Sequence, residues 1–435
     1  MEIKMKTTIV SPKIYTYGSL VLGGILRDRG HAVSITRDLS SEGDLTLLSL
    51  FSTSQLLDPE IRELASRAPR IYVGGPVGLV PEIVLGELEV DAVVVGEGEE
   101  VVADLVEGGP SEEISGLAFL RDGVVVKTDP IPVSDLDHVM PLIPDDLRSQ
   151  SVRGANVYIE THRGCLGGCT FCQVPRFFGR SIRSRSLENI LAEVREMKRR
   201  GVTRVAVSGG TGSLFGYGKE VNKEAFITLL KGLAEILGPK NLSVPDMRVD
   251  FVDEEILEAV RRYTVGWVFF GIESGSPGIL RAMKKGTTPE KSLEAVELAH
   301  QSGVKVGGSF IVGYPGEMEE DYQATLDFME EAMLEDVFAS VAEPIPGTPL
   351  AKIALDLPRE DNPLYREHAG EYRALRISEA EARCFNLMLT GMSCKPVPRI
   401  VDDATYSAFL QEVRTQGRDV RRVMGLLEKY KDRIV

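Results

Sequence analysis

The sequence predicts an α/β protein with two successive arrays of alternating strands and helices, followed by a helical region. Short β-branched runs alternate with amphipathic segments up to about residue 108, and the alternation resumes at residue 155. Between the two arrays, Pro130, Pro132, Pro141 and Pro144 interrupt regular structure. From about residue 356 strand signals fade, and amphipathic helices are expected over 379–390 and 402–430. The expected divisions are a first array over 1–108, a linker over 109–154, a second array over 155–350 and a helical domain over 351–435.

Composition restricts the class of protein. The chain has 435 residues, enough for two or three domains, and 43% of them are hydrophobic. No apolar run approaches the ~18 residues that span a bilayer, and no small-residue cleavage site follows the first strand. We therefore expect a cytoplasmic protein with no membrane partner. The net charge of −15 disfavours nucleic acid as a partner, because its binding depends on Lys and Arg contacts to phosphate.

The first array has strand signals at 7–11, 31–35, 45–50, 70–76 and 91–99, with helices expected at 17–29 and 59–67. This alternation favours a doubly wound parallel sheet, in which ligands bind beyond the carboxyl ends of the strands. The loops at those ends are expected to line one site, and they comprise Ser11; Phe51, Ser52, Thr53, Ser54 and Gln55; Gly74, Gly75 and Pro76; and Gly96, Glu97, Gly98 and Glu99. Residues 116–127 are expected to form a hairpin inside the linker, with Asp122-Gly123 as its turn.

The second array has six strand signals, at 155–160, 203–208, 243–250, 265–272, 304–312 and 336–343. Helices are expected between and after them at 187–200, 222–236, 253–263, 289–302 and 318–335. Six βα units are too few to close an eight-fold barrel. The sequence therefore predicts a partial, TIM-like (βα)6 barrel with its chemistry at the C-terminal ends of the strands.

Cys165, Cys169 and Cys172 follow the first strand of the second array in a Cys-x3-Cys-x2-Cys pattern. Cysteine thiolates hold iron–sulfur clusters, and three thiolates on a four-iron cluster leave one iron free to chelate an amino-acid-like ligand. The flanking glycines allow the backbone to wrap the cluster closely. The alternatives are a zinc site with His162 as the fourth ligand, or no metal.

The five cysteines are odd in number and three of them are clustered, which argues against a disulfide framework and fits a reducing compartment. The distant Cys384 and Cys394 are expected to be buried apolar residues. Four arginines follow the cysteine motif at 176, 180, 183 and 185. We interpret them as a wall that faces anionic ligands, with a basic groove as the alternative.

Polar and glycine-rich positions also follow the later strands, where a barrel places cofactor contacts. They are Ser208, Gly209, Gly210 and Thr211 after the second strand, Arg248 and Asp250 at the end of the third, Glu273 and Ser274 after the fourth, and Ile311 near the end of the fifth. A glycine-rich turn of this kind is more often only a turn. Glu317 is expected to be a first-turn helix residue that the helix dipole favours.

From residue 155 to about 345 the chain resembles the radical S-adenosylmethionine (SAM) superfamily. The resemblance rests on the cysteine triplet with Phe171 before its last member, the glycine-rich second strand end, and the stretches 271–276, 311–317 and 346–350. It implies a [4Fe–4S] cluster whose open iron binds SAM, and one-electron cleavage of SAM to methionine and a 5′-deoxyadenosyl radical. By resemblance Gly209, Gly210 and Thr211 hold the methionine part, although Thr211 replaces the usual acidic residue. Further contacts are implied for Phe171, Ser208, Arg248, Glu273, Ser274 and Ile311.

Residues 1–108 resemble the Rossmann-like cobalamin-binding domain of cobalamin-dependent members of that superfamily. The resemblance rests on Gly74-Gly75-Pro76 and on Gly96-Glu97-Gly98-Glu99. The Asp-x-His-x-x-Gly motif that ligates cobalt in many cobalamin proteins does not occur in the sequence. The resemblance then implies that the lower face of cobalamin lies against residues 51–56. The alternative is a scaffold that has lost the cofactor.

Together these resemblances imply a cobalamin-dependent (class B) radical SAM methyltransferase that methylates an unactivated carbon by way of methylcobalamin. Within this group the chain looks similar to archaeal enzymes that modify methyl-coenzyme M reductase, with the glutamine C-methyltransferase as the specific expectation. This implies a protein or peptide substrate, a ferredoxin or flavodoxin as electron donor, and a monomer.

Three other functions are alternatives to this expectation. Methylthiotransferases share the core but carry three further cysteines in the N-terminal domain, and this chain has none before Cys165. A radical rearrangement, cyclisation or oxidation of a small molecule would use the same cofactors. A non-catalytic sensor of cobalamin or SAM would bind them without turnover.

Overall fold

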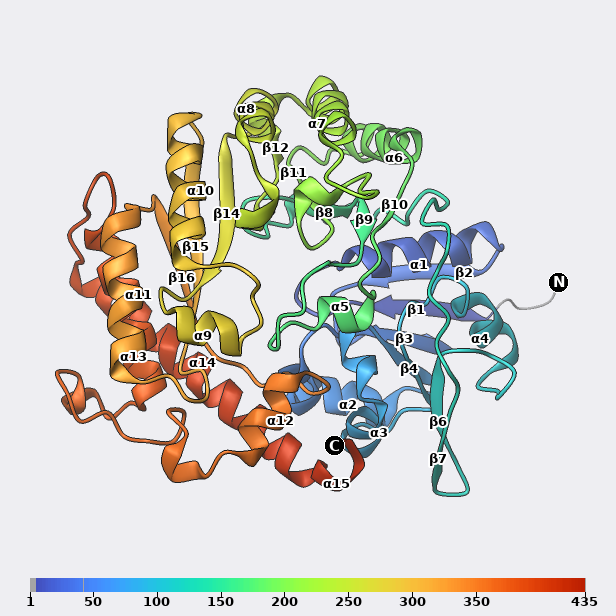
Figure 1. Ribbon diagram of the computed structural model, residues 1–435. Helices are drawn as coiled ribbons and strands as arrows, with labels where there is room; N and C mark the ends of the chain where they lie inside the picture. The colour runs from blue at the N-terminus through green and yellow to red at the C-terminus, as the bar shows by residue number, and fades with distance from the viewer. Residues whose placement is uncertain (1–4, 42, 435) are drawn as a thin grey trace.

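The first array forms a seven-stranded sheet with helices on both faces (Figure 1). The computed structural model describes residues 5–41 and 43–434; the expected first domain also includes residues 1–4, which lie outside the described part. The sheet has the order β2-β1-β3-β4-β5-β6-β7, and the strands are β1 (Lys6–Val10), β2 (Ala32–Thr36), β3 (Leu45–Ser49), β4 (Ile71–Gly74), β5 (Ala92–Val94), β6 (Leu117–Arg121) and β7 (Val124–Lys127). The pairs from β2 to β5 are parallel, which confirms the doubly wound arrangement.

Two apolar layers hold the helices on this sheet. One layer contains Ile61 and Leu64 of α2 (Pro59–Arg67) and Ile83 and Val84 of α3 (Pro81–Glu87). The opposite layer contains Leu26 of α1 (Tyr17–Asp28) and Leu105 of α4 (Val102–Gly108). The alternation of side chains along each strand gives the sheet these two apolar faces.

The hairpin at residues 116–127 forms as expected, but it does not belong to a linker. Asp122 (φ 52°) and Gly123 (φ 78°) form its turn, and β6 pairs antiparallel with β5. The first sheet therefore extends to Lys127, beyond the boundary expected at residue 108. A second correction concerns the expected strand 91–99, which ends at Val94 because Gly96 adopts φ 90°.

The second array forms an open barrel whose six expected strands are all present. They are β8 (Val157–Glu160), β11 (Val205–Ser208), the pair β12 (Leu242–Ser243) and β13 (Asp246–Met247), β14 (Trp267–Glu273), β15 (Lys305–Val312) and β16 (Asp336–Val341). The third expected strand, 243–250, is divided at Pro245, which lacks a backbone N–H and cannot continue the ladder. The barrel consequently comprises sheets ordered β12-β11-β8 and β13-β14-β15-β16.

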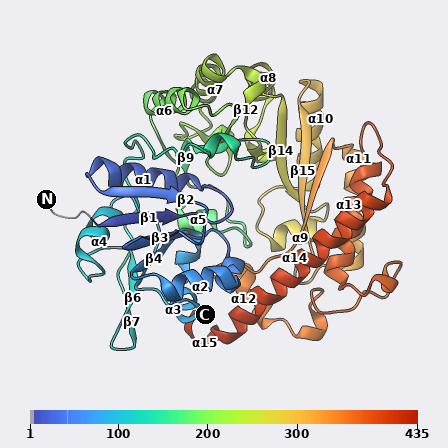
Figure 2. The ribbon, with the colours of Figure 1, turned by 180° about the vertical axis from the view of Figure 1, so that it is seen from behind.

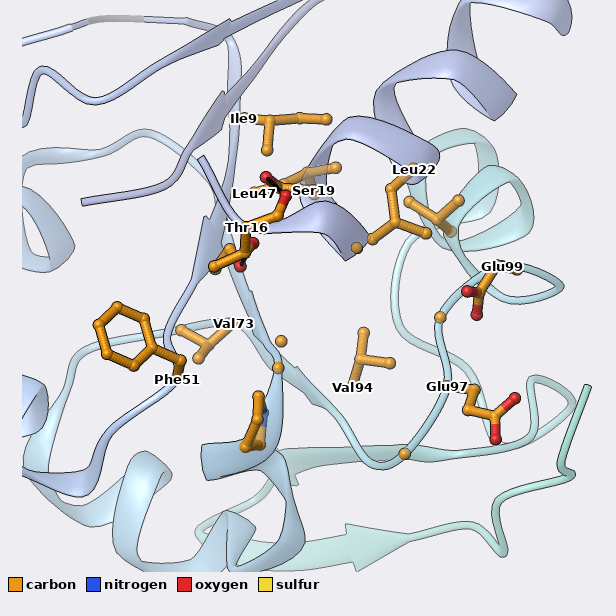
Figure 3. A pocket seen from close by; sticks show the side chains of 18 of the residues that line it. Ile9, Thr16, Ser19, Leu22, Leu47, Phe51, Val73, Val94, Glu97 and Glu99 are labelled. Atoms are coloured by element: carbon orange, nitrogen blue, oxygen red, sulfur yellow. Dashed lines mark hydrogen bonds between the residues drawn. The ribbon is translucent and has the colours of Figure 1, made fainter. Parts of the chain in front are cut away.

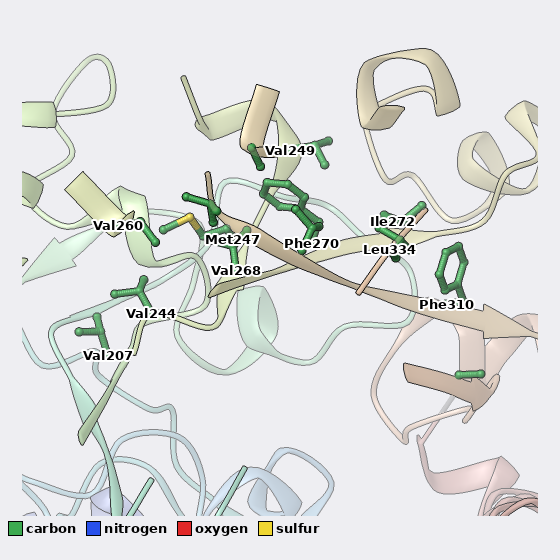
Figure 4. Close-up of a cluster of buried hydrophobic side chains, with 14 of the residues drawn as sticks. Val207, Val244, Met247, Val249, Val260, Val268, Phe270, Ile272, Phe310 and Leu334 are labelled. Atoms are coloured by element: carbon green, nitrogen blue, oxygen red, sulfur yellow. The ribbon is translucent and has the colours of Figure 1, made fainter. Parts of the chain in front are cut away.

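Helices cover the outside of the barrel and apolar side chains fill its interior. The expected helices are α6 (Leu187–Arg199), α7 (Lys223–Leu237), α8 (Glu254–Tyr263), α10 (Pro289–Gln301) and α11 (Glu319–Ala332). Phe270, Ile272 and Phe310 belong to the buried cluster drawn in Figure 4. Two short helices, α9 (Pro277–Ala282) and α12 (Pro349–Asp356), lie in loops where sequence analysis expected none.

The C-terminal region is helical, as expected, with α13 (Glu379–Ser393), α14 (Asp403–Lys429) and α15 (Lys431–Ile434). Helix α14 crosses the back of the molecule from the barrel to the first domain (Figure 2). At its end Lys429 and Tyr430 bind Glu87 at 2.5 and 2.9 Å, and Arg422 donates to the carbonyl of Leu57. No helix among the described residues combines the length and apolarity needed to cross a membrane.

Gln416 of α14 closes the free edge of the barrel at β16. Its Oε1 accepts from the backbone N–H of Val341 at 3.0 Å, and its Nε2 donates to the carbonyl of Ala339 at 3.4 Å.

We predict that Gln416→Leu lowers the free energy of unfolding by about 1–2 kcal/mol, because buried backbone groups lose their partners. Gln411→Leu, on the exposed face of the same helix, should change it by less than about 0.5 kcal/mol. Urea titrations of the two variants measure this difference, and equal losses would contradict the assignment.

Candidate active site

The three cysteines lie on a loop that follows β9 (His162–Arg163) and is fixed on several sides. A Cβ at Gly164 (φ 96°) would lie 2.2 Å from the carbonyl oxygen of Ser181, so only glycine fits there. Thr170 donates its backbone N–H to Met283 O at 2.9 Å and accepts from Leu350 N at 3.0 Å. Arg176, which belongs to α5 (Val174–Phe177), donates to the carbonyls of Cys169 and Cys172. All three cysteines are free thiols.

The surroundings of the thiols fit an iron–sulfur cluster. A Cβ on Gly167 would lie 3.4 Å from Cys165 Sγ and 3.7 Å from Cys169 Sγ, so bare backbone lies close to both sulfurs. Arg248 Nη1 donates to Cys169 Sγ at 3.7 Å, and Arg248 Nη2 is held by the carbonyl of Lys285 at 2.7 Å. Burial raises the pKa of Cys172 to about 11. A metal centre lowers the pKa of a coordinating thiol, so cluster binding would offset this cost.

The zinc alternative is not supported by the position of His162. Its ring packs beneath Gly209, where a Cβ would come within 2.3 Å of the ring, and its Nδ1 lies 3.0 Å from Thr161 Oγ1. Burial lowers its pKa to about 4, so the ring is neutral. Across residues 5–41 and 43–434, no three His, Cys, Asp or Glu side chains are arranged to hold a single metal ion.

The glycine-rich turn after β11 lies against the cysteine loop. A Cβ on Gly210 (φ 87°) would be 3.4 Å from Gly164 O and 3.9 Å from Cys165 Cβ. The hydroxyls of Thr211 and Ser213 are buried and have no hydrogen-bond partner. Unpaired buried hydroxyls are costly, and a polar ligand would satisfy them. Ser208, at the end of β11, is half-buried and accepts from Thr161 N through its carbonyl.

The other predicted contacts divide into two groups. Phe171 and Ile311 pack against the same small apolar cluster beside the cysteine loop, and Glu273 (φ 69°) forms a buried ion pair with Lys285 at 2.7 Å. Ser274, in contrast, bonds to Thr325 and to the backbone of Ser276, where it stabilises a turn. The structure therefore gives Ser274 a local structural partner rather than an open position.

Glu317 and the two remaining cysteines also have definite positions. Glu317 precedes α11 instead of lying in its first turn, and its Oε2 accepts from Gly313 N at 2.8 Å and Arg383 Nη1 at 2.9 Å. Its Oε1 is buried without a partner. Cys384 is fully buried, as expected, whereas Cys394 is half-buried at the end of α13.

A cavity open to solvent lies between the first sheet and the barrel, and the empty space at the site, including solvent at the opening, is about 1010 Å³. Figure 3 shows Phe51 on one side and Glu97 and Glu99 on the other, with Val73 and Val94 between them. The predicted residues that line the cavity are Phe51, Gly74, Gly75, Pro76, Gly96, Glu97, Gly98 and Glu99. The carboxyl ends of the strands therefore meet at one site, as the doubly wound fold requires.

Five predicted residues do not line this cavity. Ser11 donates to Ile14 O at 2.7 Å and so stabilises its own loop. Ser52 and Gln55 form a reciprocal capping box around the short 3-10 turn 53–57, which also contains Thr53 and Ser54. These polar side chains satisfy the backbone of their own turn, which sequence analysis did not recognise.

The cavity has two walls that sequence analysis missed. The first wall is apolar and comes from the sheet and from helices α1 and α4; its residues are Ile9, Leu22, Leu47, Tyr72, Val94, Val102 and Leu105. The barrel contributes Glu160, Arg163, Phe177 and Phe178. The alternation of apolar residues along the strands could have indicated the first wall. No sequence pattern connects the barrel residues of the second wall with the 96–99 loop, about 60 residues earlier.

Arg163 joins the two sides of the cavity in a buried ionic network. Its guanidinium binds Glu97 at 2.8 Å, Glu160 at 2.8 Å and Glu99, and Arg183 also binds Glu97. The side chains of Arg163 and Glu97 are only 5% and 2% exposed. Burial raises the pKa of Glu160 to about 7, whereas for Glu97 the two guanidinium groups outweigh burial and lower the pKa.

Comparison with known proteins identifies the family. Residues 159–329 match the Radical SAM superfamily. A Methanocaldococcus jannaschii protein, provisionally named a methylthiotransferase, is 50% identical over 439 residues, which is 98% of this chain and 97% of that protein. The chain belongs to the radical SAM superfamily. An uncharacterized methyltransferase of Pyrococcus horikoshii is 28% identical over 78% of each chain.

Solved structures of two radical SAM enzymes share the overall fold. One is TsrM from Kitasatospora setae, a radical SAM methyltransferase solved with cobalamin and a [4Fe–4S] cluster bound. The match covers 97% of this chain and 99% of the TsrM chain, with a TM-score of 0.68 and 16% identity. OxsB, a cobalamin-dependent SAM radical enzyme solved with aqua-cobalamin bound, matches 97% of this chain and 56% of its own, with a TM-score of 0.63 and 18% identity. The likeness includes the first domain, the barrel and the helical region.

Arg163→Met should destabilise the protein by about 3 kcal/mol or more, because it leaves buried carboxylates without their cation. The matched control is Arg121→Met, which breaks an ion pair with Glu112 whose side chains are more than half exposed. That control should cost less than about 1 kcal/mol. Urea-induced unfolding of both variants measures the difference, and a loss no larger for Arg163→Met would show that the network does not stabilise the fold.

Glu317 should make stability depend on pH. Burial raises its pKa from 4.5 to about 7 in the folded protein, so the folded state holds a proton that the unfolded chain has released. Stability should therefore fall as pH rises from about 4.5 to 7. Glu317→Gln, which has no such proton, should lose less stability over this range than the native protein. Thermal melting at both ends of the range checks this, and parallel curves would contradict it.

Proposed function

We propose that the chain is a cobalamin-dependent radical SAM C-methyltransferase that acts on an unactivated sp3 carbon. The observation that carries the proposal is the shared cavity, in which the loops of the first sheet face the barrel strand that leads into the cysteine loop. Arg163 belongs to both features, since it lines the cavity and precedes Cys165 by two residues. A cofactor in the cavity and one on the cysteine loop would be close neighbours.

The residues fit three cofactors. Cys165, Cys169 and Cys172 would hold a [4Fe–4S] cluster, and the Gly209-Gly210 backbone with the unpaired Thr211 hydroxyl would hold the methionine part of SAM. The cavity, with its apolar wall, would hold cobalamin. When bound, the cluster and SAM supply a 5′-deoxyadenosyl radical, and cobalamin supplies the methyl group.

The chain's own residues position these groups. Arg248 donates to Cys169 Sγ and places a positive charge beside the cluster ligands, which favours their thiolate form. The buried Glu273–Lys285 pair is anchored by Ser309, whose hydroxyl donates to Glu273 at 3.5 Å. Phe177 and Phe178 stack edge to face at 4.7 Å and line the barrel side of the cavity, where they offer an apolar surface to a bound cofactor.

For the substrate we propose a glutamine side chain of methyl-coenzyme M reductase, presented as a protein or peptide. The support is the resemblance to archaeal enzymes of that kind; the relative from Methanocaldococcus jannaschii adds only that a similar chain occurs in an archaeon. We further propose a monomer that receives electrons from a ferredoxin or flavodoxin and has no nucleic-acid partner. The net charge of −15 supports the last point.

A methylthiotransferase is the second candidate, because the 50% identical relative carries that provisional name. A tRNA methylthiolating enzyme of Nitrosomonas europaea is also 33% identical, over 48% of each chain. The cysteine inventory opposes this candidate: methylthiotransferases resemble this core but use three further N-terminal cysteines, and none precedes Cys165 here.

Product mass separates the candidates. With SAM, cobalamin and a low-potential reductant, a synthetic peptide carrying the candidate glutamine should gain one CH2 unit, and 5′-deoxyadenosine should form. Cys172→Ala should abolish both, whereas Cys394→Ala should keep both near the native rate. A gain of one CH2S unit would establish methylthiolation. Full SAM cleavage with no gain of a methyl group would favour a rearrangement or oxidation.

A further inference from the structure

Three segments around the cysteine loop carry positive charge and no negative charge. Residues 166–182, 277–286 and 344–355 contain no Asp or Glu, in a chain with 65 acidic residues among 435. At that frequency a stretch of this combined length would hold about six acidic residues. The segments instead contain Arg176, Arg180, Arg281, Lys284, Lys285 and Lys352.

These segments are packed together in the folded chain. Met283 and Ile279 of the α9 region, Leu350 of α12 and Phe171 of the cysteine loop belong to one apolar cluster. The backbone of Thr170 bonds to Met283 on one side and to Leu350 on the other. Figure 1 shows α5, α9 and α12 around the middle of the face turned to the viewer. The segments that carry the cations therefore meet at a single loop, and we name their exposed surface the basic face. Asp321, which accepts from Ser276 Oγ at the start of α9, borders it.

Three of its cations are exposed and unpaired. Arg281, Lys284 and Lys352 are exposed, and none of them pairs with a carboxylate anywhere in the described part of the chain. Lys285 differs, because it is buried against Glu273. Arg176 and Arg180 are committed to the loop, since they donate to the carbonyls of Cys169 and Leu166. Ile353, 38% exposed beside Lys352, adds an apolar contact.

We propose that the basic face docks an acidic one-electron carrier protein of the ferredoxin class; the inference rests on the proposed function. Elsewhere a chain of net charge −15 repels an acidic protein, so complementary charge over the cysteine loop would select this approach. The reduced carrier loses one electron and the cluster on the cysteines gains it. No proton and no group moves in this step. Thr170 links the docking helices directly to the cluster ligands.

Charge reversal on the basic face tests the proposal. The variant Arg281→Glu/Lys284→Glu/Lys352→Glu is compared with Arg204→Glu/Lys231→Glu/Lys240→Glu, which makes the same charge change at exposed positions on the far side of the barrel. The probe is a recombinant acidic 2[4Fe–4S] ferredoxin, oxidised for binding by biolayer interferometry and reduced for stopped-flow transfer to the holoprotein. Circular dichroism and melting curves establish that both variants fold.

The basic-face variant should bind ferredoxin at least about tenfold more weakly and accept its electron at least about tenfold more slowly. In the control variant, affinity and rate should each change less than about twofold. Native binding should weaken as salt rises from about 50 to about 300 mM. With dithionite as reductant, both variants should form 5′-deoxyadenosine at the native rate. The dithionite assay tests the proposed function separately from the docking surface. If the native protein were inactive with dithionite, the proposed function would be wrong, whereas the ferredoxin binding result would stand.

Two outcomes would overturn the docking proposal. Unchanged ferredoxin binding by the basic-face variant would show that ferredoxin does not dock there. Equal losses in both variants would show that only net charge matters. Native ferredoxin binding combined with lost turnover in dithionite would assign the basic face to the substrate protein instead.

Discussion

Arg163 lies where the first domain, the first barrel strand and the cysteine loop meet, and its ionic network sets their relative positions. The guanidinium binds Glu160 at the end of the preceding strand β8, and Glu97 and Glu99 from the loop after β5. Two residues later the chain reaches Cys165. A displacement of the first domain would therefore pull on the cysteine loop through one buried side chain.

The buried network around Arg163 contains one more carboxylate than guanidinium groups. Arg163 and Arg183 face three carboxylates, and the one whose pKa rises to about 7 is Glu160, where burial exceeds the effect of the guanidinium groups. Buried ions of this kind are costly to desolvate, so they stabilise one arrangement more than they stabilise the fold as a whole. The network therefore fixes the wall of the cavity. At the back of the molecule, α14 fixes the first domain in a similar way, because Lys429 and Tyr430 bind Glu87 at the end of α3.

Much of the fold and part of the site were predictable from local patterns. The six barrel strands, the five barrel helices and the sheet of the first domain followed from hydrophobic periodicity, and the cysteine loop followed from its spacing. The loops Gly74–Pro76 and Gly96–Glu99 reached the cavity because parallel strands end at one edge. These features depend on residues that are close in sequence or on a general rule of topology.

Two of the wrong predictions involve contacts between residues that are distant in sequence, and two involve local chemistry. Arg163 and Glu97 are 66 residues apart, and nothing in either local pattern indicates the pair. The hairpin 116–127 had the correct turn residues, but its pairing with β5 depends on tertiary structure. Ser52 and Gln55 satisfied their own turn, and Pro245 divided a strand whose apolar pattern suggested continuity. Long-range packing explains the missed Arg163–Glu97 pair and the hairpin. Local chemistry explains the 52–55 turn and the break at Pro245.

A single chain is proposed to hold a corrinoid in the cavity and an iron–sulfur cluster on the neighbouring cysteine loop, which Arg163 joins to the cavity wall. The most direct test is metal analysis of the protein after anaerobic loading with iron, sulfide and hydroxocobalamin and removal of unbound material. We expect about four iron atoms and about one cobalt atom per chain. Magnetic coupling should appear in the paramagnetic resonance spectrum when cobalt is Co(II) and the cluster has gained one electron. A protein that retains iron but no cobalt, or whose two centres show no coupling, would contradict it.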